Sequence, residues 1–315
     1  MRVFLKNMLF CALLAGLLFL YVFVQKDQVW KITNSISIDA KLAYGRIMDA
    51  EDLDIIALGS SMTLNNLNSE KVIESLAYDL KFFNYGAFGL QIQDMKIMLE
   101  NLLQTSDPQC IIIVSNIPEF VDDQESRYSG KDLRNYMDGH LWNDVLLAVR
   151  YGFPNNLDSI KDYEYYRNQI YDYGSLNYDA YGGVALQVYG ENINDVRWNV
   201  VLEEDAKEMN YVALEKLCKL ASDNDIRLYF AQSPSRAHYT SGEGSKEIMQ
   251  AHMERCREIV EGSGQYYYSI IDPEKYEDIY FADYTHLNRE GSQLFTEEFM
   301  EFYQQCEMAV EQNTK

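Results

Sequence analysis

Two short stretches of the sequence hold the residue types that acyl transfer needs. Gly59-Ser60-Ser61 follows an apolar run, and Asp283 stands three residues before His286 in the stretch Asp-Tyr-Thr-His. A serine becomes a nucleophile when a histidine takes its proton, and a carboxylate orients that histidine and stabilises its charged form. A serine at the tip of a turn can also be a helix cap or a phosphate ligand, so its neighbours must decide between these roles.

These stretches lie where the strands of one sheet are expected to end. Apolar runs predict strands at 53–59, 81–89, 109–120, 226–234 and 265–272, and amphipathic segments predict helices at 68–80, 91–104, 203–224, 245–264 and 286–306. This alternation is typical of a doubly wound α/β fold with a central parallel sheet, in which functional groups gather at the carboxyl ends of the strands. The mostly polar stretch 60–67 is longer than the usual strand-to-helix turn of two to six residues.

The N-terminal segment predicts a membrane anchor. Residues 8–24 carry no charge, and as a helix they are about 26 Å long, close to the ~30 Å bilayer core. Arg2 and Lys6 precede them, which favours an N-terminus inside and an exported body. We expect an uncleaved signal anchor at 1–26, with Trp30 at the outer membrane interface. A cleaved signal peptide is the alternative, and it also exports the body.

The remaining chain divides by composition. Residues 27–50 predict a stalk and a helix leading into the domain, 51–305 the α/β domain, and 306–315 a C-terminal tail. Residues 121–200 interrupt the alternation with a polar, acidic insert that has nine tyrosines between Tyr151 and Tyr189. Tyrosine faces suit sugar rings, so Tyr165, Tyr173 and Tyr181 are candidate substrate-binding residues. A packed lid with no ligand is the other interpretation of this insert.

Composition and motifs exclude several classes of function. The net charge of −22 over 315 residues argues against nucleic acid as a partner, and an anionic substrate would need a local cation. No Gly-Lys-Ser/Thr follows Gly59, no two histidines share a metal spacing, and the five cysteines form no CxxC. We therefore expect neither a metal nor a cofactor.

Taken together, the motifs resemble the SGNH/GDSL hydrolase superfamily over about residues 53–120 and 205–303. Its first block matches Gly59-Ser60-Ser61, its second matches residues 84–89, its third matches residues 114–117, and its last matches residues 283–286. The resemblance implies a flavodoxin-like three-layer fold. It also implies that Ser61 is the nucleophile, Asp283 the orienting acid and His286 the base. The oxyanion hole would consist of Ser61, Gly89 and Asn116.

The sequence departs from the family pattern at three positions. Ser60 replaces the Asp of Gly-Asp-Ser, and Val114 and Ile117 replace the Gly and Asp of Gly-x-Asn-Asp. Gly-Ser-Ser is similar to a membrane-anchored, exported branch that includes the D-alanine-transfer protein of teichoic-acid D-alanylation and the acetyl-transfer partners of membrane-bound O-acyltransferases.

This branch implies serine-dependent O-acyl transfer or hydrolysis on an envelope polysaccharide, glycolipid or teichoic acid. The chain would be a single-pass protein with its catalytic domain outside the cell membrane, and it would work beside a membrane-bound O-acyltransferase. The alternative is an inactive SGNH-like protein that binds glycan or serves as a scaffold for such a transferase.

Overall fold

A five-stranded parallel sheet forms the centre of the protein. The computed structural model describes residues 1–26, 28–33, 35–48, 52–76, 79–121, 129–270 and 275–313. The strands are β1 (Ile55–Ala57), β2 (Phe82–Asn84), β3 (Cys110–Ser115), β4 (Arg227–Gln232) and β5 (Tyr266–Ser269), in the order β2-β1-β3-β4-β5. All neighbours pair in parallel. The prediction of an α/β fold with a central parallel sheet is confirmed.

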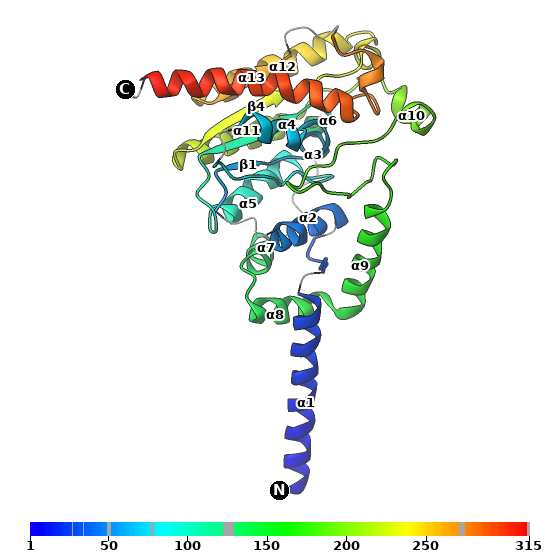
Figure 1. Ribbon diagram of the computed structural model, residues 1–315, viewed down its shortest axis with the longest axis vertical. Helices are drawn as coiled ribbons and strands as arrows, with labels where there is room; N and C mark the ends of the chain where they lie inside the picture. Colours follow the sequence, from blue (N-terminus) through cyan, green and yellow to red (C-terminus); the bar gives the residue numbers. More distant parts are fainter. Residues whose placement is uncertain are drawn as a thin grey trace.

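Helices cover both faces of this sheet (Figure 1). One face packs against α5 (Ile92–Leu102), α11 (Glu208–Asp223) and α12 (Ser245–Gly262), and the other packs against α4 (Ser69–Ser75) and α13 (Arg289–Asn313). Side chains of β3 alternate between the two cores, with Ile111 on the first face and Ile112 on the second. Burial on both faces explains why this strand is apolar at almost every position.

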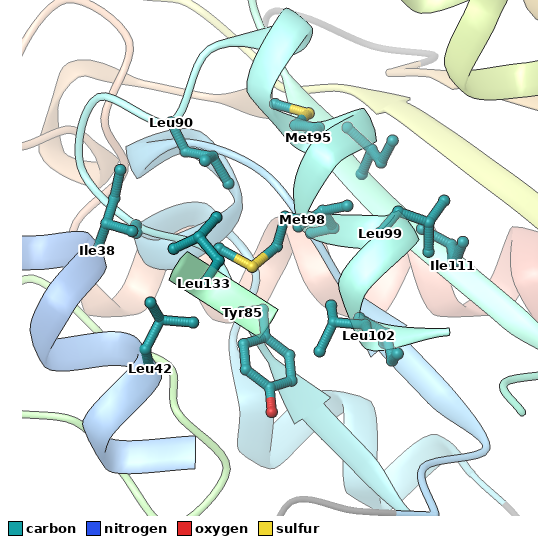
Figure 2. Packing of buried hydrophobic residues seen from close by; sticks show 14 of the residues in the cluster. Ile38, Leu42, Tyr85, Leu90, Met95, Met98, Leu99, Leu102, Ile111 and Leu133 are labelled. Carbon is teal, nitrogen blue, oxygen red and sulfur yellow. The ribbon is translucent and has the colours of Figure 1, made fainter. Parts of the chain in front are cut away.

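Helix α2 (Ile36–Ile47) packs into the core on the first face of the sheet. Figure 2 shows Ile38 and Leu42 of α2 pointing toward the side chains of α5 and toward Leu133 of α7 (Gly130–Met137). Lys41 is completely buried and its Nζ donates to the carbonyl oxygens of Asn84, at 3.0 Å, and Gly182. A buried ammonium needs such partners, so α2 is held against the end of β2.

Several element boundaries differ from those predicted. The polar stretch 60–67 contains a short helix, α3 (Ser61–Asn66), which Ser60 caps by accepting a hydrogen bond from Met62 N at 3.1 Å. The expected tail at 306–315 is helical as far as Asn313, because α13 continues beyond the domain edge. Helix α4 ends at Ser75, and residues 77–78 of the predicted helix 68–80 lie outside the described part.

The insert at 121–200 is mainly helical. It begins at the last residue of α6 (Pro118–Val121) and contains α7, α8 (Leu141–Tyr151), α9 (Phe153–Arg167), the 3₁₀ turn η1 (Gly190–Asn192) and α10 (Asp195–Trp198). Residues 122–128 lie outside the described part. In Figure 1 the helices α7, α8 and α9 lie between the sheet and the N-terminal helix.

Helix α1 (Arg2–Gln25) extends away from the body (Figure 1) and is long and apolar enough to cross a membrane, with a mean hydropathy of 2.4. Its last turns touch the body, where Val22 is fully buried. Trp30 is only 2% exposed and its indole Nε1 donates to the carbonyl of Gln25. The side chain of Trp30 is therefore packed in the protein core beside the end of α1.

Candidate active site

The turn after β1 presents Ser61 at the start of a helix. Ser61 is the first residue of α3, and Ser60 occupies the capping position before it. Gly59 is needed here, because a Cβ at this position would lie 2.0 Å from Thr63 Oγ1. That hydroxyl donates to Val114 O at 2.9 Å and accepts from Val114 N at 3.0 Å. The nucleophile candidate is thus held against the end of the central strand β3.

The structure brings Ser61, His286 and Asp283 into one chain of contacts. His286 Nε2 lies 2.9 Å from Ser61 Oγ, and His286 Nδ1 lies 2.9 Å from Asp283 Oδ2. Asp283 is fully buried, and its Oδ1 accepts from the backbone N–H groups of Thr285 at 3.0 Å and His286 at 2.8 Å. These contacts fix the carboxylate, and the carboxylate fixes the imidazole with one nitrogen facing the serine.

The charge of Asp283 is stabilised although the residue is buried. Burial alone would raise the pKa of this carboxyl, but the charge and hydrogen bonds of His286 and the Thr285 N–H outweigh it and lower the pKa. Arg197 adds a positive charge with its Nη1 at 3.7 Å from Asp283 Oδ2. The acid is therefore held in the ionised form that can stabilise a protonated imidazole.

A buried asparagine connects the serine helix to the histidine loop. Asn66, the last residue of α3, donates through Nδ2 to Thr285 O at 3.0 Å and accepts through Oδ1 from Leu287 N at 2.8 Å. These two bonds hold the backbone on either side of His286. Asn66 is completely buried, so its amide has no competing water.

The polar stretch that follows Ser61 is polar because its side chains bind the surrounding elements. Besides Thr63 and Asn66, Asn65 donates to Val184 O at 2.9 Å, and the carbonyl oxygen of Asn66 accepts from Thr296 Oγ1 of α13 at 3.4 Å. Helix α3 is thereby attached to the insert and to α13. These contacts orient a helix too short to be stable alone.

A cavity of about 510 Å³ opens beside Ser61 and His286. Its walls come from the start of α2, the turn after β2, the insert and the histidine loop. The lining residues are Ser35, Ile36, Ser37, Ser61, Phe88, Tyr166, Tyr173, Gly174, Leu176, Leu186, Arg197 and His286. Cavities of 540 Å³ and 520 Å³ lie elsewhere on the surface, so it is the triad and not the size that marks this one.

The three residues predicted to form the oxyanion hole differ in their position relative to the cavity. The backbone N–H of Ser61 lies at the N-terminus of α3, where helices leave such groups unpaired. Gly89 is exposed, adopts a left-handed φ of 73° and follows the cavity residue Phe88. Asn116 does not line the cavity. Its Nδ2 donates to Ser233 O and to Ser235 Oγ, each at 3.0 Å, so the expectation of a free Asn116 amide at this site is not met.

The three candidate tyrosines also differ in whether they line the cavity. Tyr173 lines the cavity, and its hydroxyl donates to the carbonyl of Ala282, next to Asp283. Tyr165 is 60% exposed on α9 and Tyr181 is 36% exposed, and neither lines the cavity. Tyr166, the neighbour of Tyr165, is the second tyrosine of the cavity wall.

Sequence reasoning did not identify Asn66, Tyr166 or Arg197. The density of polar residues in the stretch 60–67 was a signal for Asn66, because buried polar side chains there need partners. Nothing in the sequence distinguishes Tyr166 and Arg197 from other residues of the insert. Among the residues that the structure describes, no three metal-binding side chains gather in one place.

Neither a scan against protein-family models nor a search of curated proteins found a match for this chain.

Proposed function

We propose that this chain is an exported, membrane-anchored serine enzyme of SGNH type that transfers or hydrolyses O-acyl groups on a cell-envelope polysaccharide, glycolipid or teichoic acid. The observation that carries the proposal is the chain of contacts from Ser61 Oγ through His286 to Asp283 at the wall of a cavity. Structural turns and caps do not require this sequence of three groups, whereas nucleophilic acyl transfer does.

The proposed reaction has two halves. His286 Nε2 accepts the proton of Ser61 as Oγ attacks the ester carbonyl, and Asp283 stabilises the resulting imidazolium. The oxyanion is bound by the N–H groups of Ser61 and Gly89. The leaving alcohol takes the proton from His286, which leaves the acyl group on Ser61. A sugar hydroxyl or water then gives its proton to His286 and attacks the acyl-enzyme, and the proton returns to Ser61 as the acyl group departs.

The sheet supports the SGNH assignment. Its order β2-β1-β3-β4-β5, all parallel, is that of flavodoxin-like sheets. In such sheets ligands bind outside the carboxyl ends of the strands where the winding reverses, which here lies between β1 and β3. Ser61 follows β1 within four residues of its end. The nucleophile thus occupies the place where this architecture puts binding sites.

The packing of α1 supports a retained anchor. Val22 of α1 is fully buried, and Leu18, Phe19 and Tyr21 pack against the same core. Removing this helix as a cleaved signal peptide would expose the apolar surface that these residues cover. A helix that keeps 24 residues and joins the domain core is suited to hold the domain at the membrane.

Arg197 supports an acceptor that carries negative charge. It is the one Arg or Lys among the residues described around the cavity, and no Asp or Glu lines it, although the chain has 49 acidic residues. Its guanidinium is half exposed and lies over the Tyr173 ring at 4.9 Å. The cavity mouth therefore offers a cation and aromatic faces, which fits an anionic glycan or a phosphate-containing polymer.

The test is turnover of an aryl acetate by the full chain in detergent, with and without a glycan acceptor. Ser61→Ala should abolish turnover, and Ser60→Ala, the matched control in the same turn, should keep part of it. Acetate release and acetylated acceptor, measured together, separate hydrolysis from transfer. No turnover by the wild type, with glycan binding intact in Ser61→Ala, would favour the inactive binding or scaffolding protein instead.

A further inference from the structure

Helix α8 exposes an apolar face beside the upper end of α1. Trp142, Leu146 and Val149 are 66%, 60% and 64% exposed. Trp142, Leu146 and Val149 follow the i, i+4, i+7 spacing of a single helix face. The opposite face, with Val145, Leu147 and Ala148, is buried in the body. Soluble surfaces rarely gather large apolar side chains in this way.

The body holds α8 rigidly in this position. Arg46 of α2 forms two hydrogen bonds of 3.1 Å with Asp144 on the buried face of α8. Arg150, near the C-terminal end, pairs with the buried Asp132 of α7 at 2.8 Å. The exposed apolar face is thus a fixed part of the domain surface, and rotation of the helix cannot hide it.

The contact with α1 fixes the depth of this face. Phe19 of α1 and Trp142 of α8 pack edge to face with ring centroids 4.9 Å apart. Phe19 lies five residues before Val24, the last residue of the apolar run, which is about 7.5 Å along a helix. If α1 spans a bilayer, Trp142 lies just inside its outer boundary. Helices that lie in the membrane surface bury their apolar faces to about 5–10 Å.

We propose that α8 is an interfacial helix that inserts the side chains of Trp142, Leu146 and Val149 into the outer lipid leaflet. The inference rests on the anchor role proposed for α1. Figure 1 shows α8 running across the end of α1, as a helix in the membrane plane must when α1 crosses that plane. Trp142 takes the interfacial position that suits tryptophan. Because α8 lies at the same depth as the end of the membrane-spanning run of α1, lipid is what covers its exposed apolar face.

The arrangement sets the height of the candidate active site. Helix α9 begins two residues after α8 and rises away from it toward the sheet (Figure 1). Its 15 residues are about 22 Å long, and Tyr166 near its end lines the cavity. With α1 and α8 both held by lipid, the domain has little freedom to tilt. The cavity is then kept roughly one helix length above the lipid surface, within reach of membrane-bound donors and of surface polymers.

Spin-label depth measurements test this inference on the full chain in phosphatidylcholine vesicles. The background variant carries Cys11→Ser and Cys306→Ser, since the other three cysteines are buried. Labels are placed singly by Leu146→Cys and Val149→Cys on α8. Met308→Cys on α13, which is 54% exposed, is the aqueous control, and Leu14→Cys on α1 reports on the anchor. Collisions with oxygen and with a water-soluble nickel complex give the depth.

The labels at 146 and 149 should favour oxygen over nickel and lie about 5–10 Å below the phosphates, while the label at 308 should behave as in water. Nickel access at 146 and 149 equal to that at 308 would overturn the inference. So would protection from both reagents, which would mean that a partner protein or a second copy covers α8. If either failure occurs while the label at 14 lies in lipid, only the inference about α8 is overturned and the anchor proposal stands. A label at 14 in water would show that the anchor proposal itself has failed.

Discussion

At the scale of single residues, the candidate site depends on side chains that hold the triad as much as on the triad itself. Ser61 and His286 come from segments 225 residues apart in the sequence, and their 2.9 Å contact must be maintained by the fold. Asn66 joins the two segments directly by bonding the backbone at Thr285 and Leu287. Its loss would let the histidine loop move, and misplacement of a base by even 1 Å can cost a large factor in rate.

Asn66→Ala should therefore lower both stability and turnover. It leaves a buried C=O and a buried N–H without partners, which costs about 1–3 kcal/mol for each unsatisfied group. Asn65→Ala is the matched control, since Asn65 is equally buried and bonds Val184 instead of the histidine loop. Both variants should melt earlier, but only Asn66→Ala should lower kcat for an aryl acetate by more than tenfold. Equal losses of kcat in the two variants would contradict a positioning role.

Arg197 lies within reach of Asp283 and of the open cavity, and the two contacts predict different kinetics. If the guanidinium binds an anionic acceptor, Arg197→Gln should raise KM for an aryl ester that carries a sulfonate at least fivefold. KM for the neutral ester should stay within twofold, and added salt should weaken the effect because exposed charges are screened. A fall in kcat for both esters alike would show that Arg197 acts through Asp283 and not on the substrate.

At the scale of elements, the strands were predictable and the helix that carries the nucleophile was not. The strand β3 is apolar on both faces, a local pattern that reflects its central place in the sheet. Helix α3 has no such pattern, because its polar side chains bond partners that are 51 to 225 residues away in the sequence. Local sequence cannot show those partners, so the stretch 60–67 resembled a loop. Ser61, His286 and Asp283 could be proposed from the sequence because their residue types and motif order are distinctive. The partner of Asn116 could not, because its amide donates to the backbone of the loop after β4.

In the insert, too, the sequence could not show which tyrosine lines the cavity. Neighbouring residues on a helix point about 100° apart, so the choice between Tyr165 and Tyr166 depends on how α9 is set against the domain. Only Tyr166 lines the cavity, although the sequence offers no reason to prefer it.

These two neighbours provide a test of the insert. Tyr166→Ala should lower transfer to, or binding of, the native polymer by more than tenfold, about 1.4 kcal/mol. Tyr165→Ala should change it less than twofold, and both should leave aryl acetate turnover and melting temperature nearly unchanged. Should the two variants behave alike toward the polymer, the tyrosines would be part of a structural lid and not of an acceptor site.

At the scale of the whole molecule, two buried ionisable groups give the stability opposite pH dependences. Burial lowers the pKa of His252 to about 3 from 6.5. The unfolded chain therefore takes up a proton that the folded chain refuses, and the folded state loses stability as pH falls through this range. Burial also raises the pKa of Asp39 to about 7 from 3.8, against the hydrogen bonds of Thr33. Here the folded chain holds a proton that the unfolded chain releases, so stability falls as pH rises.

Single variants should separate the two effects. Relative to wild type, His252→Gln should gain melting temperature as pH falls from about 6.5 to 4, and Asp39→Asn should gain it as pH rises from about 4 to 7. Differences from wild type, measured on the full chain in one detergent across this range, remove contributions common to all three proteins. Difference curves of the same slope, or flat ones, would show that these side chains are not buried in the way described.

The central claim is that Ser61 carries the acyl group, and covalent labelling tests it most directly. The full chain is treated with a fluorophosphonate, digested, and the labelled peptide is sequenced by mass spectrometry. The account predicts a single adduct on Ser61 that is lost in Ser61→Ala, strongly slowed in His286→Ala and kept in Ser60→Ala. An adduct on Ser60, or wild-type protein that takes up label no faster than Ser61→Ala, would contradict it.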